Sequence, residues 1–110
     1  MDVTTIYFTI VNTDGKLQQA GWSAFVHDVA SAVMLAKLDG AVVHFSGFSN
    51  PEAPWQNAMW CVQVPEPRVG HGLRSRLQEL AARYQQDSIA WAQVDQVEQL
   101  TPAGVSERPL

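Results

Sequence analysis

The sequence predicts a single α+β domain in which two helices cover one face of a four-stranded antiparallel sheet. The first observation is the order of the hydrophobic patterns, which runs strand, helix, strand, strand, helix, strand. The second is that two strand-like segments, residues 4–11 and 57–64, can bury side chains on both faces, as interior strands do. The third is size, because 110 residues with 46% hydrophobic and 16% charged residues are typical of one globular domain. We assign this domain to residues 1–100.

Residues 4–11 are rich in β-branched and aromatic side chains, which favour a strand. Alternation divides them into two faces, with Ile6, Phe8 and Ile10 on one and Tyr7, Thr9 and Val11 on the other. Residues 12–15 (NTDG) predict a turn, in which Thr13 or Asp14 caps the helix that follows.

Residues 16–38 contain no strong helix breaker and predict the first helix. Its apolar stripe, which we expect to cover the sheet, consists of Trp22, Phe25, Val26, Val29, Val33 and Ala36. Met34 is an apolar exception on the opposite side. Asp39 and Gly40 end the helix, since glycine accepts the left-handed conformation found after a helix C-terminus.

Residues 41–46 predict a short edge strand. Alternation places Val43 and Phe45 on one face, and Val42, His44 and Ser46 on the other. Residues 47–54 contain two prolines and a glycine and predict a long loop, which is a common location for functional residues. Residues 57–64 (NAMWCVQV) are the strongest candidate for an interior strand.

Residues 65–67 (PEP) predict a break in the chain, and residues 70–72 (GHG) then lead into an amphipathic helix that ends near Gln86. Its apolar spacing is set by Leu73, Leu77, Leu80 and Tyr84. Residues 89–97 predict a second edge strand. The composition of residues 101–110 is that of a flexible tail.

This order of elements predicts the ferredoxin-like βαββαβ sandwich, in which right-handed crossovers place both helices on one face and make the first and third strands central. Over residues 4–97 the element order resembles that of ACT-like regulatory modules and dimeric α+β barrel proteins. In size and acidity the chain also resembles small proteins of phages and other mobile elements, some of which bind and block a host protein. The resemblance therefore implies a binding function.

One face of such a sheet has no helix on it. We expect the larger apolar sets, which include Val43 and Phe45, to face the helices. The side chains on the other face are then more apolar than those of an ordinary solvent-exposed surface and more polar than those of a hydrophobic core. A second copy of the chain or a small apolar or aromatic ligand would cover it. The candidate ligand-binding residues are Tyr7, His44, Phe48, Trp55, Met59 and Cys61.

The net charge of −4 argues against binding to nucleic acid, which requires a basic surface. Four of the seven basic side chains nevertheless lie between residues 68 and 83. Gly70 and Gly72 ahead of a helix could expose backbone N–H groups to an anion. We name Arg68, His71 and Arg74 as candidate anion-binding residues; the simpler interpretation is that the glycines only let the chain turn.

The histidines show no metal-ligand spacing with one another or with the single cysteine, and no motif calls for a cofactor. His44 and Cys61 could form a base and nucleophile if their strands are neighbours, although a buried cysteine beside an imidazole is the simpler interpretation. One unpaired cysteine and a start without a secretory or spanning pattern predict a cytoplasmic protein.

Three hypotheses follow. The first is a non-enzymatic binding module for a small ligand or partner, homodimeric through the open sheet face. The second is an inhibitor or adaptor of the mobile-element type, which uses its acidic surface and the Met34 side of the first helix against a host protein. The third is a small enzyme that uses His44 and Cys61.

Overall fold

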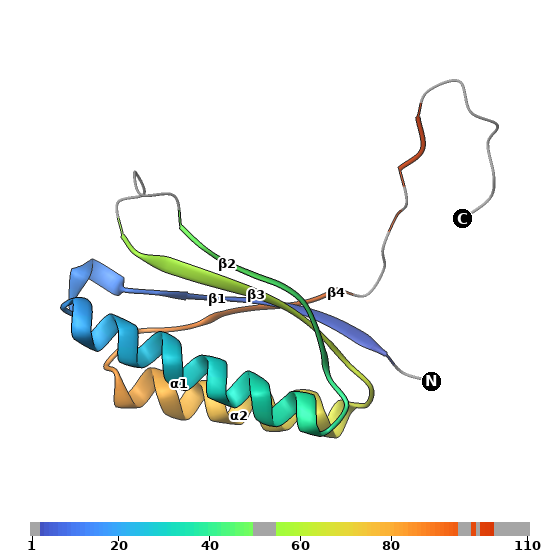
Figure 1. The fold of residues 1–110 in the computed structure, drawn as a ribbon, viewed down its shortest axis with the longest axis horizontal. Coiled ribbons are helices and arrows are strands. Elements are labelled where there is room, and N and C mark those ends of the chain that lie inside the picture. The colour runs from blue at the N-terminus through green and yellow to red at the C-terminus, as the bar shows by residue number, and fades with distance from the viewer. Residues whose placement is uncertain (1–2, 50–54, 95–97, 99, 103–110) are drawn as a thin grey trace.

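The structure is a computed structural model, and it describes residues 3–49, 55–94, 98 and 100–102. Its elements follow the order β1 (Thr4–Val11), a short 3₁₀ turn η1 (Thr13–Gly15), α1 (Gln19–Leu38), β2 (Val42–Phe48), β3 (Asn57–Val64), α2 (Pro67–Arg83) and β4 (Ala90–Val94). The strands form one antiparallel sheet in the order β2-β3-β1-β4, with both helices on the same face (Figure 1). The predicted ferredoxin-like fold is confirmed, and so are the central positions of the first and third strands.

The hydrophobic core lies between the sheet and the two helices. The sheet contributes Ile6, Phe8 and Ile10 from β1 and Trp60, Val62 and Val64 from β3. α1 contributes its predicted stripe, of which only Val26 is partly exposed, and α2 contributes Val69, Leu73, Leu77 and Leu80. Within the sheet, Phe8 and Trp60 are cross-strand partners whose rings stack with centroids 5.2 Å apart. The alternating pattern of the sequence therefore predicted the core face of both central strands.

The turn between β1 and α1 is closed by Asn12 rather than by Thr13 or Asp14, so the predicted cap is wrong. Oδ1 of Asn12 accepts the N–H of Leu17 at 2.8 Å, and Nδ2 donates to the carbonyl of Leu17 at 2.8 Å. Asp14 has φ 54, and the helix begins only at Gln19, without a side-chain cap. The buried side-chain amide of Asn12 therefore provides hydrogen-bond partners for the N–H and the carbonyl of Leu17, although it does not cap the helix.

α2 begins at Pro67, before Gly70, His71 and Gly72, so the prediction that these three residues precede the helix is also wrong. Proline suits the first helical position because its φ is already helical and the N–H that it lacks would have no partner there. The glycines therefore lie within the first turns of α2. The extended run does end before residues 65–67, as predicted, but Pro67 is already the first residue of the helix.

β2 is longer than predicted and contains an irregularity at His44. Val43 pairs with Val62, but the next residue of β2 to pair with β3 is Phe45, opposite Cys61. The extra residue is a β-bulge, and it reverses the faces of the residues after it. Phe45 therefore lies on the face without helices, and Ser46 lies opposite Trp60 on the helix side. Both assignments from simple alternation are corrected.

β2 and β4 are the edge strands, as predicted. β2 continues to Phe48, into the predicted loop, while residues 50–54 lie outside the described residues. Residues 95–97 of the predicted last strand and residues 103–110 of the predicted tail also lie outside them. None of the helices in the described part of the chain has the length and apolar run needed to cross a membrane.

Candidate functional site on the uncovered sheet face

The face of the sheet opposite the helices is built from three rows of four residues, which we call the uncovered face. In each row the residues are cross-strand partners in the order β4, β1, β3, β2. The rows are Ala90–Thr9–Met59–Gly47, Ala92–Tyr7–Cys61–Phe45 and Val94–Thr5–Gln63–Val42. Since cross-strand partners share a face, the register alone fixes this set. None of the twelve carries a formal charge.

The central row places two aromatic rings over a cysteine. Tyr7 and Phe45 lie on either side of Cys61, on strands that are not neighbours, yet their ring centroids are only 6.2 Å apart. Strands two apart in a sheet are separated by about 9–10 Å, so the rings lean toward each other above β3. Cys61 is 3% exposed although no helix covers it. We attribute its burial to this aromatic pair.

The Tyr7 hydroxyl is linked to the thiol beneath it. A hydrogen bond with the side chain of Cys61, together with the charge that the thiol can carry, raises the pKa of Tyr7 above its ordinary value. The phenolic proton of Tyr7 is therefore held more tightly than that of a free tyrosine. Tyr7 and Cys61 lie side by side as cross-strand partners in the centre of the uncovered face.

His44 projects from the bulge and contacts β3 away from Cys61. Its Nε2 lies 2.7 Å from Oε1 of Gln63. The residue of β2 that pairs with Cys61 is Phe45, so the bulge separates the imidazole from the thiol in the register. A base that activates a nucleophile must lie within hydrogen-bond reach of it. The structure brings Cys61 together with Tyr7, and the catalytic role of His44 and Cys61 stays a hypothesis.

One of the six candidate ligand-binding residues, Phe48, lies on the other side of the sheet from the uncovered face. Phe48 pairs with Ala58 on the helix side and borders a hollow with Trp22 and Val26 of α1. Phe48 was predicted to lie in the long loop and is instead the last residue of β2, and its role in ligand binding stays a prediction. Trp55 lies two residues before β3 and is 46% exposed. Tyr7, Met59 and Cys61 do share the uncovered face, with His44 beside it.

Two apolar residues of the uncovered face were missed by the sequence reasoning. Phe45 is 48% exposed and Val42 is 51% exposed, and Met59 at 37% completes the accessible apolar surface. Val42 was placed on this face but was not selected as a candidate. Phe45 carried no usable signal, since its face depends on the bulge.

The candidate anion-binding residues occupy separate surroundings at the start of α2. Arg68 forms an ion pair with Glu66 at 2.7 Å. The guanidinium carbon of Arg74 lies 6.0 Å from the centroid of the Trp91 ring, and His71 and Arg74 border a small hollow of about 90 Å³. Because the glycines lie inside the helix, backbone N–H groups of Gly70 and Gly72 are not at its N-terminus. Anion binding by Arg68, His71 and Arg74 as one set stays a prediction.

The described residues contain no group of three or more His, Cys, Asp and Glu side chains close enough to hold a metal ion. A second accessible apolar surface lies at the C-terminal end of α1. Met34 is 53% exposed, as its position opposite the stripe predicted, and it is joined by Leu35 at 45% and Leu38 at 77%. This surface lies on a helix and is separate from the uncovered face.

No protein-family model and no curated protein matches the chain. Solved structures do share its fold. The de novo designed protein Foldit4 superposes with a TM-score of 0.60 at 7% identity, over 86% of this chain and 97% of that one. A dimeric ferredoxin-like protein of unknown function from Thermobifida fusca gives 0.60 at 6% identity, over 86% and 92%. The hydroxynitrile lyase from Passiflora edulis gives 0.54 at 12% identity, over 90% and 96%.

These similar structures include a designed protein and a lyase, so the shared fold carries no single activity. All three sequence identities are too low to indicate a shared function. The comparison therefore supports the same conclusion as the strand order: this chain has a ferredoxin-like fold.

Proposed function

We propose that the protein is a non-enzymatic binding module that forms a homodimer through the uncovered face. The observation that carries the proposal is the chemistry of the three rows: twelve neighbouring residues without a formal charge, in a chain whose net charge is −4. The centres of protein interfaces are depleted of charged residues and enriched in aromatic residues and methionine. Tyr7, Phe45 and Met59 match that composition.

A second copy is the simplest occupant of this surface. In a two-fold dimer each face meets an identical face, so two acidic proteins can pair only where no like charges are brought together. The uncovered face meets that requirement. The dimeric protein from Thermobifida fusca, which has the same fold, supports the proposal as an analogy. A small apolar or aromatic ligand would then lie between the subunits, near Tyr7 and Met59.

The test is the molar mass in solution, measured by light scattering after size exclusion at two protein concentrations. We expect a dimer for the wild type. Met59→Lys places a charge in the uncovered face and should give a monomer, while Met34→Lys makes the same change on α1 and should leave the dimer intact. A wild type that stays monomeric at the higher concentration would overturn the proposal, and so would a Met59→Lys variant that still forms a dimer.

A second candidate function is binding to a host protein through α1. It is favoured by three exposed apolar side chains that lie close together on α1, those of Met34, Leu35 and Leu38. Single exposed apolar residues are common on protein surfaces, whereas a group of them often marks an interaction site. A monomeric wild type would favour binding to a host protein over homodimer formation. Partner binding that is lost in Met34→Lys and kept in Met59→Lys would then support it.

A further inference from the structure

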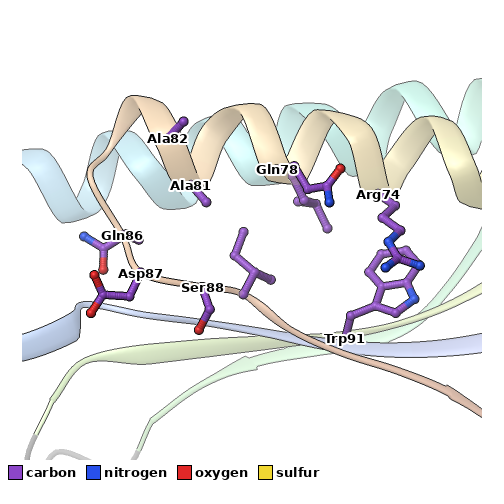
Figure 2. Close-up of a pocket in the computed structure, with 10 residues that line it drawn as sticks. Arg74, Gln78, Ala81, Ala82, Gln86, Asp87, Ser88 and Trp91 are labelled. Carbon is purple, nitrogen blue, oxygen red and sulfur yellow. The ribbon is translucent and has the colours of Figure 1, made fainter.

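A cleft lies between α2 and the start of β4, on the opposite side of the sheet from the uncovered face. Figure 2 shows it, with the helix above and the segment that leads into β4 below. Its volume is about 430 Å³, within the range of small-molecule sites. The side chains that matter for its chemistry are Arg74, Gln78, Ala81, Ser88, Ile89 and Trp91.

The cleft is lined by a small side chain of α2 on one side and by the fixed side chain of Gln86 at its far end. Ala81 presents only a methyl group where α2 passes over residues 86–89. Gln86, which is 7% exposed, accepts the N–H of Thr13 at 2.9 Å and donates to the carbonyl of Tyr84 at 3.0 Å. Its amide therefore belongs to the wall. A site fixed in this way loses little entropy when a ligand enters.

Trp91 and Arg74 form the near end of the cleft. The indole is supported from the core by Phe8, whose ring centroid is 6.2 Å away and nearly parallel. The Arg74 guanidinium lies over the indole, with its carbon 6.0 Å from the centroid. Among the ion pairs of residues 3–49 and 55–94, Arg68 and Arg83 have carboxylate partners and Arg74 has none. Within these described residues, a cation without a carboxylate partner thus lies at the near end of a cleft whose apolar side chains include Ile89 and Trp91.

The far end carries an ion pair, in which the carboxylate is the group that borders the cleft. Asp87 borders the cleft there and forms an exposed ion pair with Lys16 at 3.3 Å. A ligand with carboxylates at both ends would bring one of them toward Asp87. The charges at the two ends therefore favour a ligand with one anionic group, placed near Arg74, and an uncharged body that points toward Ala81 and Ile89.

We propose that this cleft binds a small monocarboxylic acid with an aromatic or branched apolar body. Arg74 would hold the carboxylate through its planar pair of N–H donors, with the Gln78 amide as a further donor. The body would lie between Ala81, Ile89 and the indole of Trp91. This site does not depend on dimerisation, because it lies on the helix side of the sheet.

The probe is 3-phenylpropionate, with 3-phenylpropionamide as its uncharged counterpart, added to the ¹⁵N-labelled protein and followed by NMR. We expect shifts confined to the indole N–H of Trp91 and the amides of residues 74–91, with a dissociation constant in the millimolar range. The amide should bind at least about tenfold more weakly, because it lacks the charge-assisted hydrogen bonds to Arg74. Equal binding of both compounds, shifts elsewhere, or absence of binding would overturn the proposal.

Four variants locate the site. Arg74→Gln should weaken binding of 3-phenylpropionate about tenfold, whereas Arg76→Gln, which removes the same charge from a groove between the two helices, should not. Ala81→Leu should fill the cleft and abolish binding; the thermal unfolding midpoint checks that it folds. Met59→Lys should bind as the wild type does, so failure of the dimer proposal is distinguishable from failure of this one. Unchanged binding in both Arg74→Gln and Ala81→Leu would overturn the assignment.

Discussion

Phe45 and Tyr7 lie on strands that are separated by β3, and their rings meet over Cys61 at a centroid distance of 6.2 Å. This contact exists because the bulge at His44 turns Phe45 to the uncovered face. It joins an edge strand to the centre of the sheet without a backbone hydrogen bond. It also explains why a cysteine with no helix above it is 3% exposed.

The first prediction concerns the reactivity of Cys61. Phe45→Ala removes one of the two rings above the thiol, so the rate of alkylation by iodoacetamide should rise severalfold relative to the wild type. Phe48→Ala is the matched control: it removes a more exposed ring from the same strand, on the other face of the sheet. Mass spectrometry of the alkylated protein at several times measures both rates. Equal rates for Phe45→Ala and the wild type would contradict the aromatic cover.

The second prediction concerns Asn12, which is 4% exposed and closes the turn before α1. Asn12→Ala leaves both the N–H and the carbonyl of Leu17 without their partners, so the free energy of unfolding should fall by about 2–3 kcal/mol. Gln56→Ala is the control, because it removes a neighbour of Asn12 at 3.1 Å and keeps both bonds to Leu17. Urea unfolding measures both; a larger loss in Gln56→Ala would mean that Asn12 does not hold the turn.

Much of this fold follows from local side-chain patterns. β3 was predicted with its observed bounds because both of its alternating sets can be buried, and the same reasoning identified β1. The stripe from Trp22 to Ala36 predicted which side of α1 covers the sheet. These features could be predicted because each depends on one segment and on its period.

The remaining features depend on contacts between segments. The face of Phe45 is set by where β2 shifts its register against β3, and alternation within β2 does not reveal that shift. The start of α2 was misplaced because the prolines at 65 and 67 were taken as a break, although proline is common at the first position of a helix. The cleft of Arg74 and Trp91 depends on how α2 packs against the strand that follows it, so no spacing in the sequence indicates it.

The third prediction concerns Tyr84, which joins the end of α2 to α1. Its hydroxyl donates to Oδ2 of Asp28 at 2.5 Å, and its ring stacks on Phe25 at 4.9 Å. Tyr84→Phe keeps the stacking and removes the hydrogen bond to a carboxylate. We expect the free energy of unfolding at neutral pH to fall by roughly 1–2 kcal/mol, at the lower end for bonds to charged groups because the site is partly exposed.

The same contact predicts a dependence on pH. The hydrogen bond to Asp28 raises the pKa of Tyr84, with burial and the Asp28 charge acting in the same direction and the nearby Arg83 opposing them. The folded state thus holds the phenolic proton more tightly than the unfolded state does. The resulting stabilisation is complete below the ordinary tyrosine pKa of about 10 and is lost as the pH rises through the raised value.

This pKa can be measured directly because the chain contains only two tyrosines. In a Tyr7→Phe background the ultraviolet absorbance of tyrosinate reports Tyr84 alone, and its midpoint should lie above the ordinary value. Adding Asp28→Asn to that background removes the carboxylate and leaves Arg83 in place, so the midpoint should fall. A midpoint that does not respond to Asp28→Asn would show that Asp28 does not set the pKa of Tyr84, and the link between the two helices would then rest on the packing of Tyr84 against Phe25.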